Sequence, residues 1–292
     1  MIKTNNFYIK NLASKPLSIR SVLKLSQVIM PNKVSKAWLS LWLLSSELEN
    51  VYTKSVDQSV RAQKINWWSE ELLRLSKNQA RHPITRFVYE STTSFFKAED
   101  SFRDILNYWI ELNSYVPYLW VNQNELSLFS NVLYGEFEKL MAMVVLKRSL
   151  NDDEISIIGL FTDIKVRTEL LQNFGLHLRN GHIPIPISVL NNHQLLSQEI
   201  LLCRSENEIF KWEELTEELI KPIQSKLILA SSALNEMPRK TYRSLWLLRT
   251  HLEIYQKLIE IIENQKCAVL SQHIDISPRT SIFILFKNRY LF

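Results

Sequence analysis

Glycine is scarce in this chain. Only four glycines occur in 292 residues, about a fifth of the number that an average usage of ~7% would give. Tight β-hairpins and glycine-rich phosphate loops both depend on glycine, so the scarcity argues against both. Between the prolines, apolar residues recur three or four positions apart far more often than they alternate. The sequence therefore predicts an all-α protein.

Cysteine and long apolar runs are also lacking. Cys203 and Cys267 are the two cysteines, and their separation does not match a metal-binding motif, so we expect thiols in a reducing compartment. The chain contains no run of eighteen apolar residues, and its first residues lack the apolar core of a signal peptide. These absences predict a cytoplasmic protein whose membrane contact is at most peripheral.

The charges are balanced and dispersed. Lys and Arg number 35 and Asp and Glu number 30, a formal net charge of +5. The basic residues are scattered among acids and form no block, whereas nucleic-acid-binding proteins show a clustered basic footprint. We therefore expect no nucleic-acid partner. No segment resembles a flexible linker, and 292 residues lie near the upper size of a single hydrophobic core.

Apolar spacing and the breaks between apolar segments predict a series of helices. Residues 151–154 are typical of a helix N-terminus, not of a metal site. Residues 277 and 278 supply a serine cap followed by proline at the first helical position. The expected helices are 16–29, 34–54, 99–113, 126–146, one that runs through residue 159 towards a proline-rich stop, 206–235, 238–263 and 276–286.

The proline-rich stop is the most informative stretch. Residues 159–186 hold three of the four glycines, and their helix runs into Gly-His-Ile-Pro-Ile-Pro. This frame resembles the second signature of the squalene/phytoene synthase family, in which two aspartates four residues apart precede Gly-Arg-x-Tyr-Leu-Pro. With Pro186 on the family's proline, His182 falls on the arginine, and Asn173 and His177 fall on the two aspartates. The frame is kept, but both carboxylates are replaced.

Two further blocks support the resemblance. Trp67 and Trp68 precede a His-Pro pair at a spacing similar to the family's, which is the most specific local match, and we expect this block to be structural. On the helix at 34–54, the positions of the family's first aspartate-rich motif are Glu49, Asn50 and Thr53. One carboxylate of three is therefore left there.

The resemblance covers roughly residues 8–286. It implies one domain over residues 1–292, built as an isoprenoid-synthase-like helical bundle around a central cavity. Active members join two prenyl diphosphates head to head, using Mg²⁺ held by aspartate pairs on two facing helices. Because so few of these carboxylates are present, we expect no metal and no cofactor. Glu49 and Glu169 are the weak candidates for a rebuilt magnesium site.

Other residues are candidates for ligand contact. Lys165, Arg167, Arg179 and His182 either bind a phosphate head directly or form a solvated helix face. His177 is expected to be a packing residue and not a catalytic base.

The helix at 126–146 carries Tyr134 and Gly135 in a run comparable with the one along which the family's prenyl chain lies. A glycine inside a helix costs about 1 kcal/mol relative to alanine. Gly135 therefore indicates either close helix packing, which we expect, or room for a ligand.

Three functions are consistent with this pattern. The first is a squalene/phytoene synthase-like pseudoenzyme without prenyltransferase activity that binds a prenyl diphosphate, another lipid-like ligand or a protein partner. The family's respiratory complex I assembly factors are of this sort. The second is an active Mg²⁺-dependent head-to-head prenyl transferase with relocated acids. The third is a helical interaction module whose cavity is filled by side chains.

Overall fold

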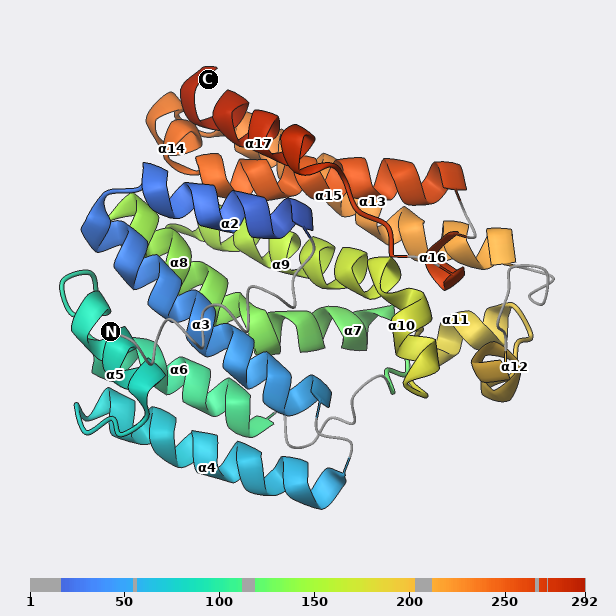
Figure 1. The fold of residues 1–292 in the computed structure, drawn as a ribbon, viewed down its shortest axis with the longest axis horizontal. Coiled ribbons are helices and arrows are strands. Elements are labelled where there is room, and N and C mark those ends of the chain that lie inside the picture. Colours follow the sequence, from blue (N-terminus) through green and yellow to red (C-terminus); the bar gives the residue numbers. More distant parts are fainter. Residues whose placement is uncertain are drawn as a thin grey trace. The chain divides into compact units, whose positions relative to one another are not determined.

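The computed structural model describes residues 17–54, 57–111, 119–202, 212–265, 268–271 and 273–291. Within these ranges the regular structure is entirely helical (Figure 1), which confirms the all-α prediction. Contacts between Cα atoms divide the chain into two compact units, and each unit is described by itself. That residues 1–292 form one domain stays a prediction.

The first unit is built around α3. This helix packs against α5 and α8, and α4 packs along α6. Leu41, Leu44 and Leu48 are buried on α3, as their spacing on one helical face predicts. The helices of the first unit are α2 (Leu17–Ile29), α3 (Asn32–Lys54), α4 (Gln58–Ser76), α5 (Pro83–Thr92), α6 (Ala98–Glu111), η2 (Asn131–Gly135), α8 (Glu136–Leu146) and the part of α9 (Asp152–Gln172) that ends at Ile158.

The second unit is organised around α15, which packs against α13, α17 and η4. None of the described helices is long and apolar enough to cross a membrane. The helices of this unit are α7 (Gln123–Ser130), α9 from Gly159 onward, α10 (Phe174–Arg179), α11 (Ile187–Asn192), α12 (Ser197–Leu202), α13 (Trp212–Glu236), α14 (Arg239–Ser244), α15 (Trp246–Gln265), α16 (Ala268–Ser271), α17 (Pro278–Phe286) and η4 (Lys287–Leu291).

Two predicted helix starts are confirmed in atomic detail. At α9, Asn151 Oδ1 accepts a hydrogen bond from the Glu154 amide at 2.9 Å, and Glu154 Oε2 accepts one from the Asn151 amide at 3.0 Å. This reciprocal arrangement is a capping box. At α17, Ser277 Oγ accepts a hydrogen bond from the Thr280 amide at 3.1 Å. Both helices therefore begin where short polar side chains satisfy free backbone amides.

Three predicted helices are interrupted, and the one expected over 126–146 is divided by the π-helical turn η2. The helix expected over 238–263 is divided at Leu245, whose ψ of 22° is far from the helical value near −42°. The helix through residue 159 ends at Gln172, because the Asn173 side chain donates a hydrogen bond to the Glu169 carbonyl at 2.8 Å. Asparagine side chains compete for backbone groups in this way and weaken helices.

The Trp-Trp and His-Pro block forms one packed cluster in the first unit. Trp68 is buried, and its ring centroid lies 5.1 Å from that of His82. Beneath the rings, the buried Glu71 carboxylate accepts hydrogen bonds from the Arg81 amide at 2.7 Å and the His82 amide at 2.8 Å. Its contacts tie α4 to the start of α5, so the structural role predicted for this block is confirmed.

Candidate functional site

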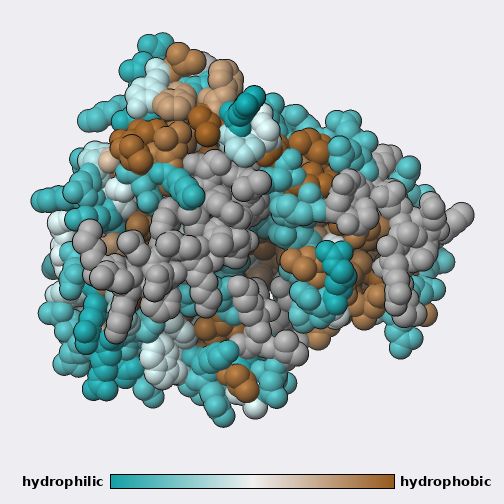
Figure 2. Space-filling view, in the orientation of Figure 1, coloured by the Kyte–Doolittle hydropathy of each residue, from teal (hydrophilic) through white to brown (hydrophobic). Residues whose placement is uncertain are grey.

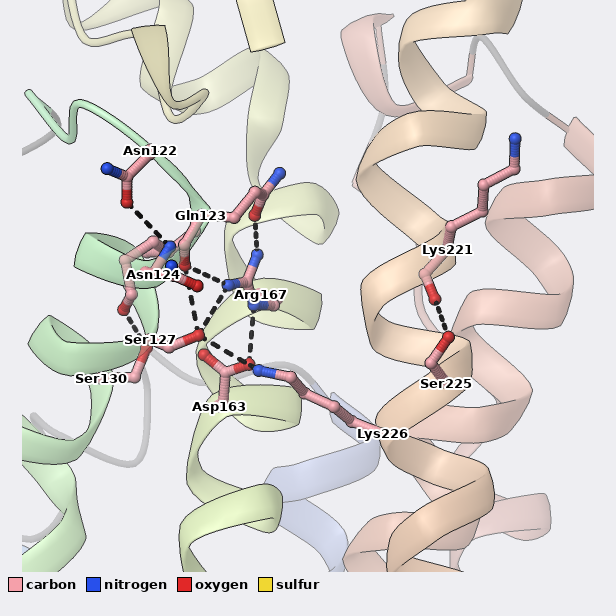
Figure 3. Close-up of polar contacts among 11 residues, drawn as sticks. Asn122, Gln123, Asn124, Ser127, Ser130, Asp163, Arg167, Lys221, Ser225 and Lys226 are labelled. Carbon is pink, nitrogen blue, oxygen red and sulfur yellow. Dashed lines mark hydrogen bonds and ion pairs between the residues drawn. The ribbon is translucent and has the colours of Figure 1, made fainter. Parts of the chain in front are cut away.

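The most concentrated group of polar side chains in the second unit lies between α7, α9 and α13 (Figure 3). Asp163 and Arg167 stand one turn apart on α9 and are both buried, with Arg167 Nε 2.8 Å from Asp163 Oδ2. Lys226 reaches over from α13 and also pairs with Asp163 Oδ2. Side chains four residues apart on a helix share a face, which places the acid and the guanidinium together.

The α7 helix supplies the neutral partners of this cluster. Arg167 Nη2 donates to the Gln123 carbonyl at 2.8 Å and to Ser127 Oγ at 2.9 Å. Arg167 Nη1 donates to Gln123 Oε1, and Lys226 Nζ lies 3.1 Å from Ser127 Oγ. All three guanidinium nitrogens of Arg167 are therefore engaged by groups of the protein itself.

The cluster carries more positive than negative charge. Arg167 and Lys226 are two cations around the single Asp163 carboxylate. Among the described residues, Asp163 Oδ1 accepts no hydrogen bond. Buried charges are costly unless paired, so Asp163 is the group on which this arrangement depends. We interpret the cluster as a cross-link of three helices, and Arg167 as a structural member of it.

The opposite face of α9 is directed to α15. Glu169 Oε1 accepts a hydrogen bond from the Tyr255 hydroxyl at 3.1 Å. His251 stacks on Phe161 with ring centroids 6.1 Å apart. Burial, and to a lesser degree the positive charge of Lys165, lowers the pKa of His251 to about 3. Glu169 and Lys165 are both half-buried, so two sequence candidates lie along this face.

The positions of the family's second aspartate pair hold neutral groups. Asn173 uses its amide to close the end of α9. His177 is half-buried on α10, and burial, followed by the charge of His182, lowers its pKa to about 4. The imidazole of His177 is therefore uncharged at neutral pH.

The residues that follow His177 form the turn out of α10. The His177 carbonyl accepts a hydrogen bond from the His182 amide at 2.9 Å. Burial also lowers the pKa of His182. Arg179 is exposed, and Gly181 has a φ of 77°, a backbone conformation that glycine adopts without strain. Of the candidates for phosphate contact, Arg179 is thus the one whose side chain lies at the surface.

The candidates in the first unit lie on two helices. Glu49 and Asn50 are half-buried in the last turns of α3, and the side chain of Thr53 is outside the described residues. Tyr134 and Gly135 are buried in η2, a π-helical turn between α7 and α8. Such turns are often found at functional sites.

The close packing expected at Gly135 is wrong. A Cβ atom there would lie 3.5 Å from Asn131 Oδ1, an ordinary van der Waals distance. The tightly packed glycine is Gly175, where a Cβ would lie 2.1 Å from the Leu270 carbonyl oxygen. Because Gly175 lies in α10 and Leu270 in α16, the absence of a side chain lets these helices approach each other.

Across the described ranges, no three His, Cys, Asp or Glu side chains gather in a way that could hold a metal ion. Glu169 is the acid nearest in sequence to the Asn173 and His177 positions, and its contact is with Tyr255. Magnesium prefers several hard oxygen ligands, mainly carboxylates. Glu49 and Glu169 stay the candidates for a metal site, and neither belongs to such a group of three among the described residues.

No protein family model and no curated protein matches the sequence. Several solved structures match, including the following two. A dehydrosqualene synthase in complex with ligand matches with a TM-score of 0.71 at 12% identity, over 97% of each chain. The chain has the fold of the squalene synthases. Squalene synthase HpnC from Alicyclobacillus acidocaldarius matches with a TM-score of 0.65 at 13% identity, over 88% of this chain and 98% of that one.

The squalene synthase fold confirms the isoprenoid-synthase-like architecture that the motif resemblance predicts. Identities of 12% and 13% establish the fold alone. The polar cluster between α7, α9 and α13 involves residues that the motifs do not single out. Gln123, Ser127 and Lys226 lie far apart in the sequence, so only the packing of α7 and α13 beside α9 reveals them.

The buried histidines of this squalene synthase fold predict a loss of stability in mild acid. The pKa of His177 is lowered from 6.5 to about 4, so below pH 6.5 the unfolded chain binds a proton that the folded chain does not. Stability is therefore complete above pH 6.5 and falls as the pH approaches 4. At pH 5.5 the protonation of His177 in the unfolded chain is expected to lower the free energy of unfolding by up to about 1.4 kcal/mol.

Urea unfolding at pH 7.5 and 5.5 measures this loss. His177→Gln does not titrate, so it should remove part of the difference between the two pH values. His273→Gln is the control, because His273 is exposed. An unchanged pH dependence in His177→Gln would contradict the buried, neutral state of this imidazole.

Proposed function

We propose that this protein is a squalene synthase-like pseudoenzyme that binds a prenyl diphosphate or another lipid-like ligand without transferring the prenyl group. The observation that carries the proposal is the neutral state of the second motif. Asn173 is an amide bonded to the helix backbone, and His177 is an imidazole kept uncharged by burial. Neither provides the negative charge that holds magnesium.

Prenyl transfer of this class begins when a diphosphate leaves, and that step develops strong negative charge. Magnesium stabilises the charge best when carboxylates hold it against the phosphate oxygens. Of the four principal aspartate positions, Glu49 alone is acidic, and Thr53, Asn173 and His177 are neutral. Without the metal clamp the leaving group lacks its electrostatic stabilisation, so binding can persist while ionisation is lost.

A ligand role has two kinds of support. The neighbouring dehydrosqualene synthase was solved in complex with a ligand, and we extend ligand binding to this chain by proposal. Lys165, Arg179 and His182 are the residues that we assign to the phosphate end. Arg167 is less suited to that role because Asp163, Gln123 and Ser127 already hold it. Tyr134 and Gly135 are assigned to the apolar chain.

The alternative is an active Mg²⁺-dependent transferase, and Glu169 favours it. Its half-buried carboxylate is held by Tyr255 at 3.1 Å, one turn before Asn173, where it would serve as a relocated acid for the metal. In that case Glu169→Gln abolishes magnesium-dependent binding while the protein stays folded. In the proposed pseudoenzyme the same variant keeps its affinity in the presence and absence of Mg²⁺.

Isothermal titration calorimetry with farnesyl diphosphate tests the proposal. We expect binding with the same affinity, within about threefold, in Mg²⁺ and in EDTA, because no metal bridges the ligand and the protein. Affinity that rises tenfold or more with Mg²⁺ supports the transferase and contradicts the pseudoenzyme. An absence of binding in both buffers contradicts the lipid-ligand role and favours the interaction module, whose partner is a protein.

A further inference from the structure

The outward face of α17 and η4 is apolar where a solvated face would be polar. Four exposed residues on this face follow one another at spacings of four, three and four positions, and these are Arg279, Phe283, Phe286 and Tyr290. Such spacing forms a single helical stripe. The exposed fractions are 65% for Phe283, 43% for Phe286 and 62% for Tyr290. The rings of Phe286 and Tyr290 stack with centroids 5.8 Å apart. We call Phe283, Phe286 and Tyr290 the aromatic stripe.

The segments around the aromatic stripe are basic and contain no acid. Residues 238–252 hold four Lys or Arg and residues 276–292 hold three, with no Asp or Glu in either segment. The whole chain, by contrast, has 30 acids to 35 bases. In α14, Arg239, Lys240 and Arg243 are all exposed. Acids and bases are mixed in the rest of the chain, whereas the charged residues of these two segments are all basic.

The contacts of α15 place these segments together. The Arg249 guanidinium lies 3.7 Å from the centre of the Tyr242 ring of α14. The same guanidinium donates a hydrogen bond to Asn288 Oδ1 of η4 at 2.8 Å. One turn earlier on α15, the Trp246 ring lies 5.5 Å from the Arg289 guanidinium of η4. One turn of α15 therefore joins α14 to η4.

The figures agree with this arrangement. In Figure 1, α14 and α17 lie together at the end of the view where the C-terminus is marked. Figure 2 shows hydrophobic residues interspersed with hydrophilic ones at the same end. On α15 the half-buried Glu253 contacts η4, where Lys287 Nζ lies 2.7 Å and Asn288 Nδ2 lies 3.0 Å from its carboxylate oxygens. The charged residues within α14, α17 and η4 are all basic, and the exposed Glu236 precedes α14.

We propose that α14, α17 and η4 form a docking surface for an anionic lipid bilayer. Exposed aromatic residues flanked by Lys and Arg are the chemistry of helices that lie in the membrane interface. Basic groups near an anionic leaflet are attracted to it, and the rings bury apolar area among the headgroups. A second copy of this chain fits poorly, because two surfaces without acids repel each other. The proposal does not depend on a prenyl ligand.

Co-sedimentation with vesicles tests the docking surface. The full chain is mixed with vesicles of phosphatidylcholine alone, or with about a third phosphatidylglycerol, at low and physiological salt. Binding is expected with the anionic vesicles and should weaken as salt is raised. Phe283→Ser with Phe286→Ser, and separately Arg239→Glu with Lys240→Glu, should each lower the partition constant at least about tenfold.

Matched variants in the first unit separate surface chemistry from net charge. Lys33→Glu with Lys36→Glu changes the net charge as much as the α14 pair does, and Val28→Ser removes a similarly exposed apolar side chain. Both controls should bind within about twofold of the unchanged protein. Equal binding to neutral vesicles, no binding at low salt, or equal losses in the controls would overturn the proposal. Two other results would also overturn the proposal if vesicles are not bound. They are a dimer in solution, or binding to duplex DNA, that the same surface variants abolish.

Discussion

Asp163→Ala is expected to lower the free energy of unfolding by about 3 kcal/mol or more. The substitution leaves the Arg167 guanidinium buried and removes the carboxylate that pairs with both Arg167 and Lys226. Breaking a buried pair by removing one partner is strongly destabilising, because the remaining charge loses its compensation inside the protein. Lys226 is partly exposed, so we take the lower end of the usual range. Urea unfolding followed by circular dichroism measures the change.

A surface ion pair provides the control for Asp163. Glu70 lies 3.3 Å from Arg74, and the Glu70 side chain is 71% exposed. Pairs of this kind contribute little, so Glu70→Ala should cost less than about 1 kcal/mol. If Asp163→Ala costs no more than Glu70→Ala, the cluster between α7, α9 and α13 does not hold these helices together. Asp163→Asn, which keeps the shape and loses the charge, should also destabilise the protein.

Gly175→Ala is expected to destabilise the protein by about 3 kcal/mol, more than most alanine substitutions. The added Cβ would lie 2.1 Å from the Leu270 carbonyl oxygen, 2.8 Å from its carbon and 3.0 Å from the Val269 carbonyl oxygen. These are backbone atoms, so α16 must move away from α10. Overpacking of this kind costs about 1–3 kcal/mol or more, which outweighs the gain of about 1 kcal/mol in helix propensity.

Gly135→Ala is the matched control for Gly175. Gly135 has helical φ and ψ of −56° and −46°, and a Cβ there reaches only Asn131, at 3.5 Å. The same substitution should therefore be neutral or stabilise the protein by up to about 1 kcal/mol. Thermal unfolding of the two variants side by side gives the comparison. Equal melting temperatures would show that α10 and α16 do not pack as closely as described.

The helices that the sequence predicts best are those with local signals. Ser277 and Pro278 identify the start of α17, and Asn151 with Glu154 identifies the start of α9, because a cap acts within one turn of the chain. The break at Asn173 also has a local cause, a side chain that bonds to the backbone. Hydrophobic periodicity alone did not reveal it, since the apolar spacing continues past Asn173 to Leu178.

The polar cluster and the close helix contact could not be predicted in the same way. Lys226 is 63 residues from Asp163, so no local pattern connects the two. The place of Gly135 inside a predicted helix indicated close packing there, and no such prediction was made for Gly175. Which of them is closely packed depends on whether a neighbouring backbone lies beside it, and in Gly175 this is the Leu270 carbonyl. The absence of negative charge from the second motif could be predicted from the sequence, because neither Asn173 nor His177 is an acid. Asn173 is neutral by residue type, and its environment keeps His177 neutral.

The most direct test of the account is product analysis after incubation with farnesyl diphosphate and Mg²⁺. The purified chain is incubated at neutral pH, the lipids are extracted, and thirty-carbon products are measured by mass spectrometry against a heat-denatured sample. We expect no product above that background, because Asn173 and His177 provide no charge for a metal clamp. Magnesium-dependent formation of a head-to-head product that Glu169→Gln abolishes would contradict it and establish an active transferase.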